Sequence, residues 1–170
     1  MTDYSYVASY DVRKALIREL EDAGLYDPND YYADGFITAL EPVIPAQQVP
    51  EFNNLLPGKT YIIYDIVQNN TGVAWWMSEE TITFDITSRS SAEIQTIANM
   101  ITDVFRRYDT SAKEINLALS PTSPYIYHYF RLDSADPVQA FQDEGGFMSG
   151  LVSVTYGYTR ELDPLTGRYL

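Results

Sequence analysis

The clearest pattern of hydrophobic and polar positions predicts a helix that begins near Ser90 and runs to Tyr108. Ser90 and Glu93 stand three residues apart, as in a capping box, which marks the start of a helix. The apolar residues that follow keep helical spacing, and the Arg106–Arg107 pair near the end suits the helix dipole. The predicted apolar stripe consists of Ile94, Ile97, Ala98, Ile101, Val104, Phe105 and Tyr108.

A second amphipathic pattern predicts a helix over residues 10–24. Apolar residues at spacings of three and four form one stripe, and charged residues fill the opposite face. Ser9 or Asp11 is expected to cap its start, and Gly24 is expected to follow its end as the C′ residue. Residues 111–119 are predicted to add a short helical turn before Pro121. The stripe of the 10–24 helix consists of Val12, Leu16, Leu20 and Ala23.

Alternating patterns predict strands over residues 60–68, 73–77, 80–88, 125–132 and 147–159. Residues 69–72, Asn-Asn-Thr-Gly, are predicted to form a turn, and a bulge is expected near residues 78–79. In the 80–88 strand, three large apolar residues alternate with polar ones, which predicts one buried and one polar face. These apolar residues are Ile82, Phe84 and Ile86, and Val152, Val154, Tyr156 and Tyr158 share one face of the last strand in the same way.

Four segments lack such periodicity: an N-terminal arm (1–9), a loop (25–58), a polar insertion (133–146) and a C-terminal tail (160–170). The loop contains five prolines, which exclude a long helix, and short strand pieces are expected near residues 35–40. A loop of this length within a compact domain is typical of contact with a partner. Because no internal repeat or linker is visible, the 170 residues predict a single α+β domain.

Composition narrows the class of protein. Apolar residues make up 45% of the chain, but their uninterrupted runs span only a few residues, whereas a membrane helix needs about 20. The chain contains no cysteine, which excludes disulfides, thiolate metal sites and a cysteine nucleophile. The N-terminal residues lack the basic and apolar regions of a signal peptide. We therefore expect a protein that is made and used in a cytoplasm.

The net charge of −13 argues against specific binding to nucleic acid, because such a surface repels phosphate. Two interpretations of the acidity stay open: it maintains solubility, or it lines a wall that DNA passes without sticking. The high tyrosine content, 15 residues, also has two interpretations, since tyrosine is favoured both at protein interfaces and on β-sheet surfaces.

A search for chemistry gives no catalytic, cofactor-binding or metal-binding site. The single histidine, His128, lies within a predicted strand with no recognisable catalytic partner, which favours a structural or interface role. The segment that starts at Asp27 opens like a calcium loop, but Tyr32 stands where that loop requires glycine. Adjacent acidic pairs, at residues 79–80 and 143–144, are interpreted as solvated turn or edge charges. No phosphate-binding glycine loop occurs.

Aromatic residues are the better candidates for function. Trp75 and Trp76 are adjacent in a predicted strand and therefore face opposite sides, so one is expected in the core and the other at a subunit contact. The alternative is that both belong to the core and rim of one sheet. The candidate interface residues are Tyr31, Tyr32, Phe52, Trp75, Trp76, Tyr125, Tyr127, Phe141 and Tyr169.

The order of elements resembles the tail terminator, or tail completion, family of long-tailed bacteriophages. The resemblance rests on the strand Tyr61–Tyr64 after a proline-rich stretch, and on the strand 80–86 that leads through Ser90–Glu93 into a helix. In this family, a strand of the form T-x-x-(I/V)-x-(I/V)-x-S precedes a helix of the form A-x-x-I-A-x-x-I. Residues 83–88 and 92–101 follow these patterns with some departures. The likeness covers residues 10–159 but not the insertion or the C-terminal tail.

The resemblance implies a mixed, mostly antiparallel sheet with two main helices on one face, and a hexameric ring without catalytic residues or cofactors. Such rings cap the tail tube in the virion and contact tube, sheath and neck or head-closure proteins, while DNA passes through. Six copies would carry a charge of −78, which suits a lumen for DNA. The alternatives are another neck, head-closure or tail-tube component, a small hydrolase built around His128, or an acidic binding module.

Overall fold

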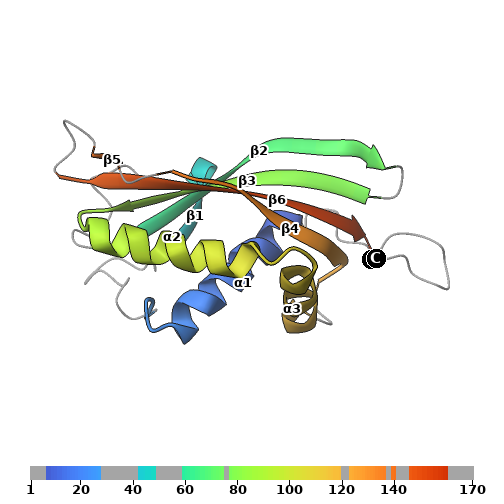
Figure 1. Ribbon diagram of the computed structural model, residues 1–170, viewed down its shortest axis with the longest axis horizontal. Coiled ribbons are helices and arrows are strands. Elements are labelled where there is room, and N and C mark those ends of the chain that lie inside the picture. Colours follow the sequence, from blue (N-terminus) through green and yellow to red (C-terminus); the bar gives the residue numbers. More distant parts are fainter. Residues whose placement is uncertain are drawn as a thin grey trace.

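The computed structural model describes residues 7–27, 42–48, 59–74, 77–119, 123–136, 139–140 and 146–160 (Figure 1). Within these ranges the elements are α1 (Ala8–Asp22), β1 (Val43–Pro45), the 3₁₀ helix η2 (Ala46–Gln48), β2 (Tyr61–Ala74), β3 (Met77–Ser88), α2 (Ser91–Phe105), α3 (Asp109–Leu119), β4 (Tyr125–Ala135), β5 (Gln139–Ala140) and β6 (Met148–Arg160).

The described strands form one sheet in the order β1-β2-β3-β6-β4, and β5 pairs with the start of β6. β1 runs parallel to β2, and every other pair is antiparallel. Helices α1, α2 and α3 all lie on the same side of this sheet (Figure 1). The predicted α+β class, with a mixed, mostly antiparallel sheet and helices on one face, is confirmed. The helical turn expected at residues 111–119 is a full third helix of 11 residues.

The core lies between the sheet and the helices, as the alternating patterns require. Ile82, Phe84 and Ile86 of β3 are all 0% exposed, as are Val152, Val154 and Tyr156 of the neighbouring β6. Three phenylalanine rings join the layers, because Phe105 of α2 packs 6.0 Å from Phe84 and 5.2 Å from Phe130, measured between ring centroids.

Helix α2 begins as its sequence predicts. The Ser90 side chain accepts a hydrogen bond from the amide of Glu93 (3.3 Å), which confirms the cap. The Glu93 carboxylate then binds the hydroxyls of Thr60 (2.6 Å) and Ser88 (3.1 Å), and thereby ties the helix start to the ends of β2 and β3. The expected apolar stripe is wrong at Tyr108, which follows the end of α2, is 53% exposed and has a φ of 48°.

Helix α1 begins earlier than predicted and without the expected cap. Its first residue is Ala8, its N-cap Val7 makes no side-chain cap bond, and both Ser9 and Asp11 are buried. The prediction at the other end is confirmed, because Gly24 has a φ of 67° and closes a Schellman motif. The two bonds of this motif run from the Gly24 amide to the Glu21 carbonyl (2.9 Å) and from the Leu25 amide to the Leu20 carbonyl (2.9 Å).

Several predicted boundaries are corrected by long-range strand pairing. β2 continues through the expected turn at residues 69–72, and Ala74 pairs with Met77. The register shifts occur in β2 and β4, whereas β3 pairs with β6 without interruption past the bulge expected at residues 78–79. The insertion contains the end of β4 and all of β5, and the proline-rich loop contains β1 and η2. The strand pieces expected at residues 35–40 lie outside the described residues.

No helix in the described part of the chain is both long and apolar enough to cross a membrane.

Candidate interaction surfaces

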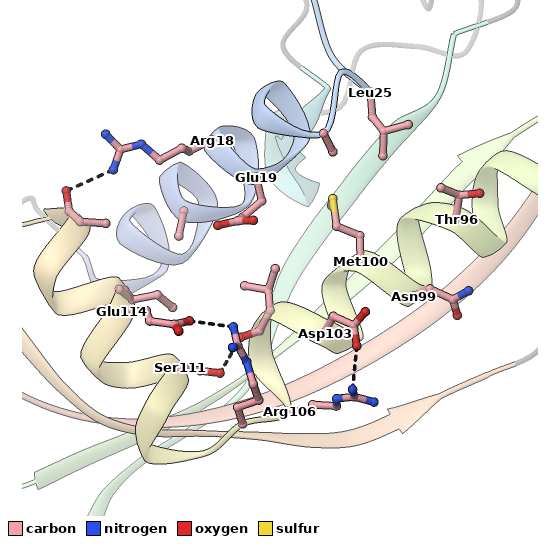
Figure 2. A pocket seen from close by; sticks show the side chains of 16 residues that line it. Arg18, Glu19, Leu25, Thr96, Asn99, Met100, Asp103, Arg106, Ser111 and Glu114 are labelled. Atoms are coloured by element: carbon pink, nitrogen blue, oxygen red, sulfur yellow. Dashed lines mark hydrogen bonds and ion pairs between the residues drawn. The ribbon is translucent and has the colours of Figure 1, made fainter.

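The helical layer contains a groove that α1, α2 and α3 line together (Figure 2). Its volume is 710 Å³, and the walls carry small and apolar side chains, among them Ala15, Leu25, Met100 and Ile115. Charged side chains surround them. A groove of this size lies within the range of ligand sites.

The charges around the groove are already matched. Arg106 lies 3.1 Å from Asp103, and Arg107 lies 2.7 Å from Glu114, in ion pairs whose side chains are at least half exposed. Arg18 extends across the groove to the carbonyl of Ala118 (3.4 Å). Exposed ion pairs of this kind contribute at most about 1 kcal/mol each to stability, so they do not fix the charged side chains around the groove rigidly. Among the described residues, no group of acidic or histidine side chains is arranged to hold a metal ion.

The face of the sheet opposite α1, α2 and α3 (Figure 1) carries hydroxyl and carboxylate side chains. Thr81 lies 2.8 Å from Thr155, measured between hydroxyl oxygens, and Thr155 donates to the carboxylate of Asp133. Asp133 in turn binds Arg131 (2.9 Å). This chain of hydrogen bonds crosses β3, β6 and β4. We call the surface the open face, and its described side chains include Ile63, Asp65, Val67, Glu79, Thr81, Thr83, Asp85, Ser153, Thr155, Tyr129, Arg131 and Asp133.

One end of the open face is organised around Tyr129. Its hydroxyl donates to the carboxylate of Glu79, and its ring stacks on Tyr108 with 5.0 Å between centroids. The ring also crosses Gly157, where a Cβ atom would clash with it. Glycine at this position therefore allows the ring to lie flat across β6.

Two carboxylates are buried on the helix side of the sheet, and both accept hydrogen bonds from tyrosine. Glu80 is 7% exposed, and its carboxylate accepts hydrogen bonds from the hydroxyls of Tyr156 (2.7 Å) and Tyr158 (2.8 Å) and from the side-chain amide of Asn69 (2.9 Å). Asp11 is 0% exposed, and the hydroxyl of Tyr127 lies 2.9 Å from its Oδ2 atom. These networks connect α1 with β4, and β2 with β3 and β6, so they hold the layers in register.

The tyrosines in these networks have pKa values above the usual range. Burial raises the pKa of Tyr127, and the charge of Asp11 raises it further. Burial likewise raises the pKa of Tyr156, with an additional contribution from Glu80. In both cases the cause is that a buried tyrosinate would lie in a medium of low polarity beside a carboxylate.

We expect the protein to lose stability as the pH rises above about 10, the ordinary pKa of tyrosine. Tyr127 and Tyr156 stay protonated in the folded state after the unfolded chain has begun to release these protons, so stability that is fully present below this pH decreases above it. Each residue contributes a slope of up to about 1.4 kcal/mol per pH unit. Urea unfolding over this range measures the slope, which Tyr156→Phe should reduce. A free energy of unfolding independent of pH would contradict the expectation.

The structure places two of the nine candidate interface residues. Tyr127 is 2% exposed and belongs to the core, so its proposed role as an exposed contact is wrong; the strand alternation turns its ring towards α1. Tyr125 is half-buried, with its ring edge-on to Tyr158 at 5.1 Å and below the guanidinium of Arg160 at 6.0 Å. The other seven, Tyr31, Tyr32, Phe52, Trp75, Trp76, Phe141 and Tyr169, lie outside the residues whose side chains are described.

The remaining candidates for chemistry are also placed. His128 is exposed on β4, and its Nε2 atom lies 2.9 Å from the hydroxyl of Thr159. The interpretation of residues 79–80 as solvated charges is wrong for Glu80, because adjacent strand residues face opposite sides and Glu80 faces the core. The alternation from Ile82 to Ile86, extended two residues backwards, already placed Glu80 on the buried side.

The chain matches no known protein-family model and no curated protein sequence.

Proposed function

We propose that this chain is a structural subunit of a bacteriophage tail, a tail terminator whose copies form a ring around the path of the DNA. The proposal continues the resemblance noted in the sequence. It is supported by the α+β architecture with α1, α2 and α3 on one face of a mixed sheet, because this is the fold that the resemblance implies.

The main support for the proposal is the acidic character of the open face. Four of its described side chains, Asp65, Glu79, Asp85 and Asp133, are carboxylates, and Arg131 is the one guanidinium among them. Around these charges lie hydroxyls that already bind one another or a carboxylate. Such a surface repels phosphate and offers few donors to it, so DNA would slide along it without being held.

In this proposal the two faces of the subunit have different roles. The open face, or part of it, lines the lumen, while the groove between α1, α2 and α3 faces the tail tube, sheath or neck proteins. The rim of the groove is balanced in charge, in contrast to a chain of net charge −13, so acidic neighbours can approach it without strong repulsion. No bond is made or broken, and no cofactor takes part.

Light scattering after size-exclusion chromatography tests the proposal. We expect an assembly near six times the 19.3 kDa mass of one chain, either alone or after addition of purified tail tubes. Electron microscopy should then show this ring at the head-proximal end of the tube. A protein that stays monomeric in both conditions, or a ring located elsewhere in the particle, would refute the tail terminator role.

A second measurement examines the lumen. The assembled ring should not retain duplex DNA at low salt, where electrostatic binding is strongest. The variant Asp85→Lys/Asp133→Lys reverses two charges on the open face and should introduce salt-sensitive retention. A matched variant, Asp103→Lys/Glu114→Lys, reverses two charges at the groove and should leave DNA retention close to that of the unmodified ring. Equal retention by both variants would argue against a lumen lined by the open face.

A further inference from the structure

Four tyrosine rings of β4 and β6 form one cluster within and against the core. The ring of Tyr158 lies 5.1 Å from that of Tyr125 and 6.0 Å from that of Tyr156, measured between centroids. Tyr127 completes the cluster, 6.1 Å from Tyr158 and 6.0 Å from Tyr156. Tyr125 and Tyr158 are half-buried, whereas Tyr127 is 2% and Tyr156 is 0% exposed. The rings therefore make a continuous path for an electron between the core and the half-buried end of the cluster.

Each of the three inner hydroxyl groups has a carboxylate as a hydrogen-bond acceptor. Tyr156 donates to Oε2 of Glu80 (2.7 Å), and Tyr158 donates to Oε1 of the same side chain (2.8 Å). The hydroxyl of Tyr127 lies 2.9 Å from Oδ2 of Asp11. A phenol that loses an electron becomes a strong acid and gives its hydroxyl proton to a base within hydrogen-bond reach. In this cluster the base is in place before an electron leaves.

Packing alone does not require these hydroxyl and carboxylate groups. The same core contains the rings of Phe84, Phe105 and Phe130, which fill their space without a polar partner. Burial of a carboxylate requires its desolvation, and replacing buried charged networks by apolar groups of similar volume is often neutral or stabilising. The placement of two buried carboxylates on three tyrosines therefore indicates a use for the hydroxyl protons.

We propose that the cluster is a one-electron donor, in which Tyr156 holds the radical and Glu80 accepts the proton. Tyr156 gives one electron to an outer-sphere oxidant of the oxidised metal-complex class, which is reduced by one electron. The hydroxyl proton moves along the existing hydrogen bond to the Glu80 carboxylate. The products are a neutral tyrosyl radical and a neutral carboxylic acid, and the return of one electron and the proton restores the starting state.

Two features of the site favour this step. Oxidation replaces the buried negative charge of Glu80 by two neutral groups, which removes the free-energy cost of a charge in a medium of low polarity. Tyr156 is 0% exposed, so its radical is kept from coupling with a radical on another molecule. The electron leaves through the half-buried rings of Tyr158 and Tyr125. Because every group belongs to one subunit, the inference is independent of the proposed ring.

Electron paramagnetic resonance after photo-oxidation tests the proposal. Light and persulfate convert tris(bipyridine)ruthenium(II) to the ruthenium(III) complex, which takes one electron from tyrosine. Exposed tyrosines also give radicals, but these couple with one another and decay quickly. We expect a second tyrosyl signal that decays at least tenfold more slowly and that is lost in Tyr156→Phe. The matched control Tyr108→Phe removes a 53% exposed tyrosine that also stacks on another tyrosine ring, and should retain the slow signal.

The variant Glu80→Gln separates proton transfer from packing. Glutamine keeps the shape of the side chain and an acceptor oxygen but does not take up the proton, so the slow signal should be lost while the circular dichroism spectrum is unchanged. A slow signal that persists in Tyr156→Phe or in folded Glu80→Gln would overturn the inference, as would the lack of a slow signal in the unmodified protein.

Deuterium oxide gives a further readout that needs no substitution and decides the matter if Glu80→Gln does not fold. In unmodified protein equilibrated in this solvent, a deuteron lies between Tyr156 and Glu80. The slow signal should then form at a lower rate, because the deuteron has to move together with the electron. An equal rate in both solvents would overturn the assignment of Glu80 as the proton acceptor.

Discussion

Replacing Glu80 by alanine is expected to lower the free energy of unfolding by about 3 kcal/mol. The substitution removes the acceptor of three hydrogen bonds, from Tyr156, Tyr158 and Asn69. Water can reach Asn69 and the half-buried Tyr158, but Tyr156 is 0% exposed, so its hydroxyl would be left without a partner inside the core. An unsatisfied buried donor costs more than the hydrogen bond itself contributes.

Urea unfolding at a fixed protein concentration measures this loss, and two variants calibrate it. Glu80→Gln keeps the shape of the side chain and one carbonyl acceptor, so it should cost about 1 kcal/mol. Asp103→Ala removes an exposed carboxylate whose ion pair with Arg106 is solvated, and should change stability by less than about 0.5 kcal/mol. If Glu80→Ala were as mild as Asp103→Ala, the buried network would contribute little to the fold.

Replacing Phe105 by alanine is expected to be still more destabilising, by about 4 kcal/mol. Phe105 is 0% exposed and lies between the rings of Phe84 in β3 and Phe130 in β4, so it connects α2 with two strands. Its removal leaves a cavity that rigid strands on the sheet side cannot fill, and the surrounding atoms lose their contacts.

Chemical or thermal unfolding followed by far-ultraviolet circular dichroism tests this expectation. Phe105→Leu should recover most of the loss, because leucine fills much of the same space. Leu117→Ala serves as the matched control on the neighbouring helix, since Leu117 is 82% exposed and buries little apolar surface. A similar effect of Phe105→Ala and Leu117→Ala would show that the aromatic contact between helix and sheet is not central to stability.

The accuracy of sequence-based prediction for this chain depends on the range of the interactions involved. The start of α2 at Ser90 and the end of α1 at Gly24 were predictable, because caps and the Schellman motif are formed by residues close in sequence. The start of α1 was not, because Asp11 is a good capping residue that is instead buried against Tyr127 of β4, more than a hundred residues away.

The candidate surfaces show the same difference between features set by local sequence and features set by long-range contacts. Alternation along β3 correctly separates core residues from those of the open face, since the two-residue period is local. It does not reveal which strands stand next to one another, and so it does not predict the Thr81–Thr155–Asp133 chain of hydrogen bonds across three strands. Nor does it predict that Asn116, on a helix that the sequence presented as a short turn, binds both the amide and the carbonyl of Tyr127 in β4.

By itself, the sequence determined the class of fold, the two main helices, most strands, and the acidic and cysteine-free character of the protein. These properties follow from composition and from periodicity within single elements. Only the tertiary structure decided which residues meet: the buried carboxylate of Glu80 binds Tyr156 and Tyr158 of β6, that of Asp11 binds Tyr127 of β4, and Asn116 of α3 binds both backbone groups of Tyr127. Each of these depends on which distant residues meet, and contacts of that kind leave no periodic signal in the chain.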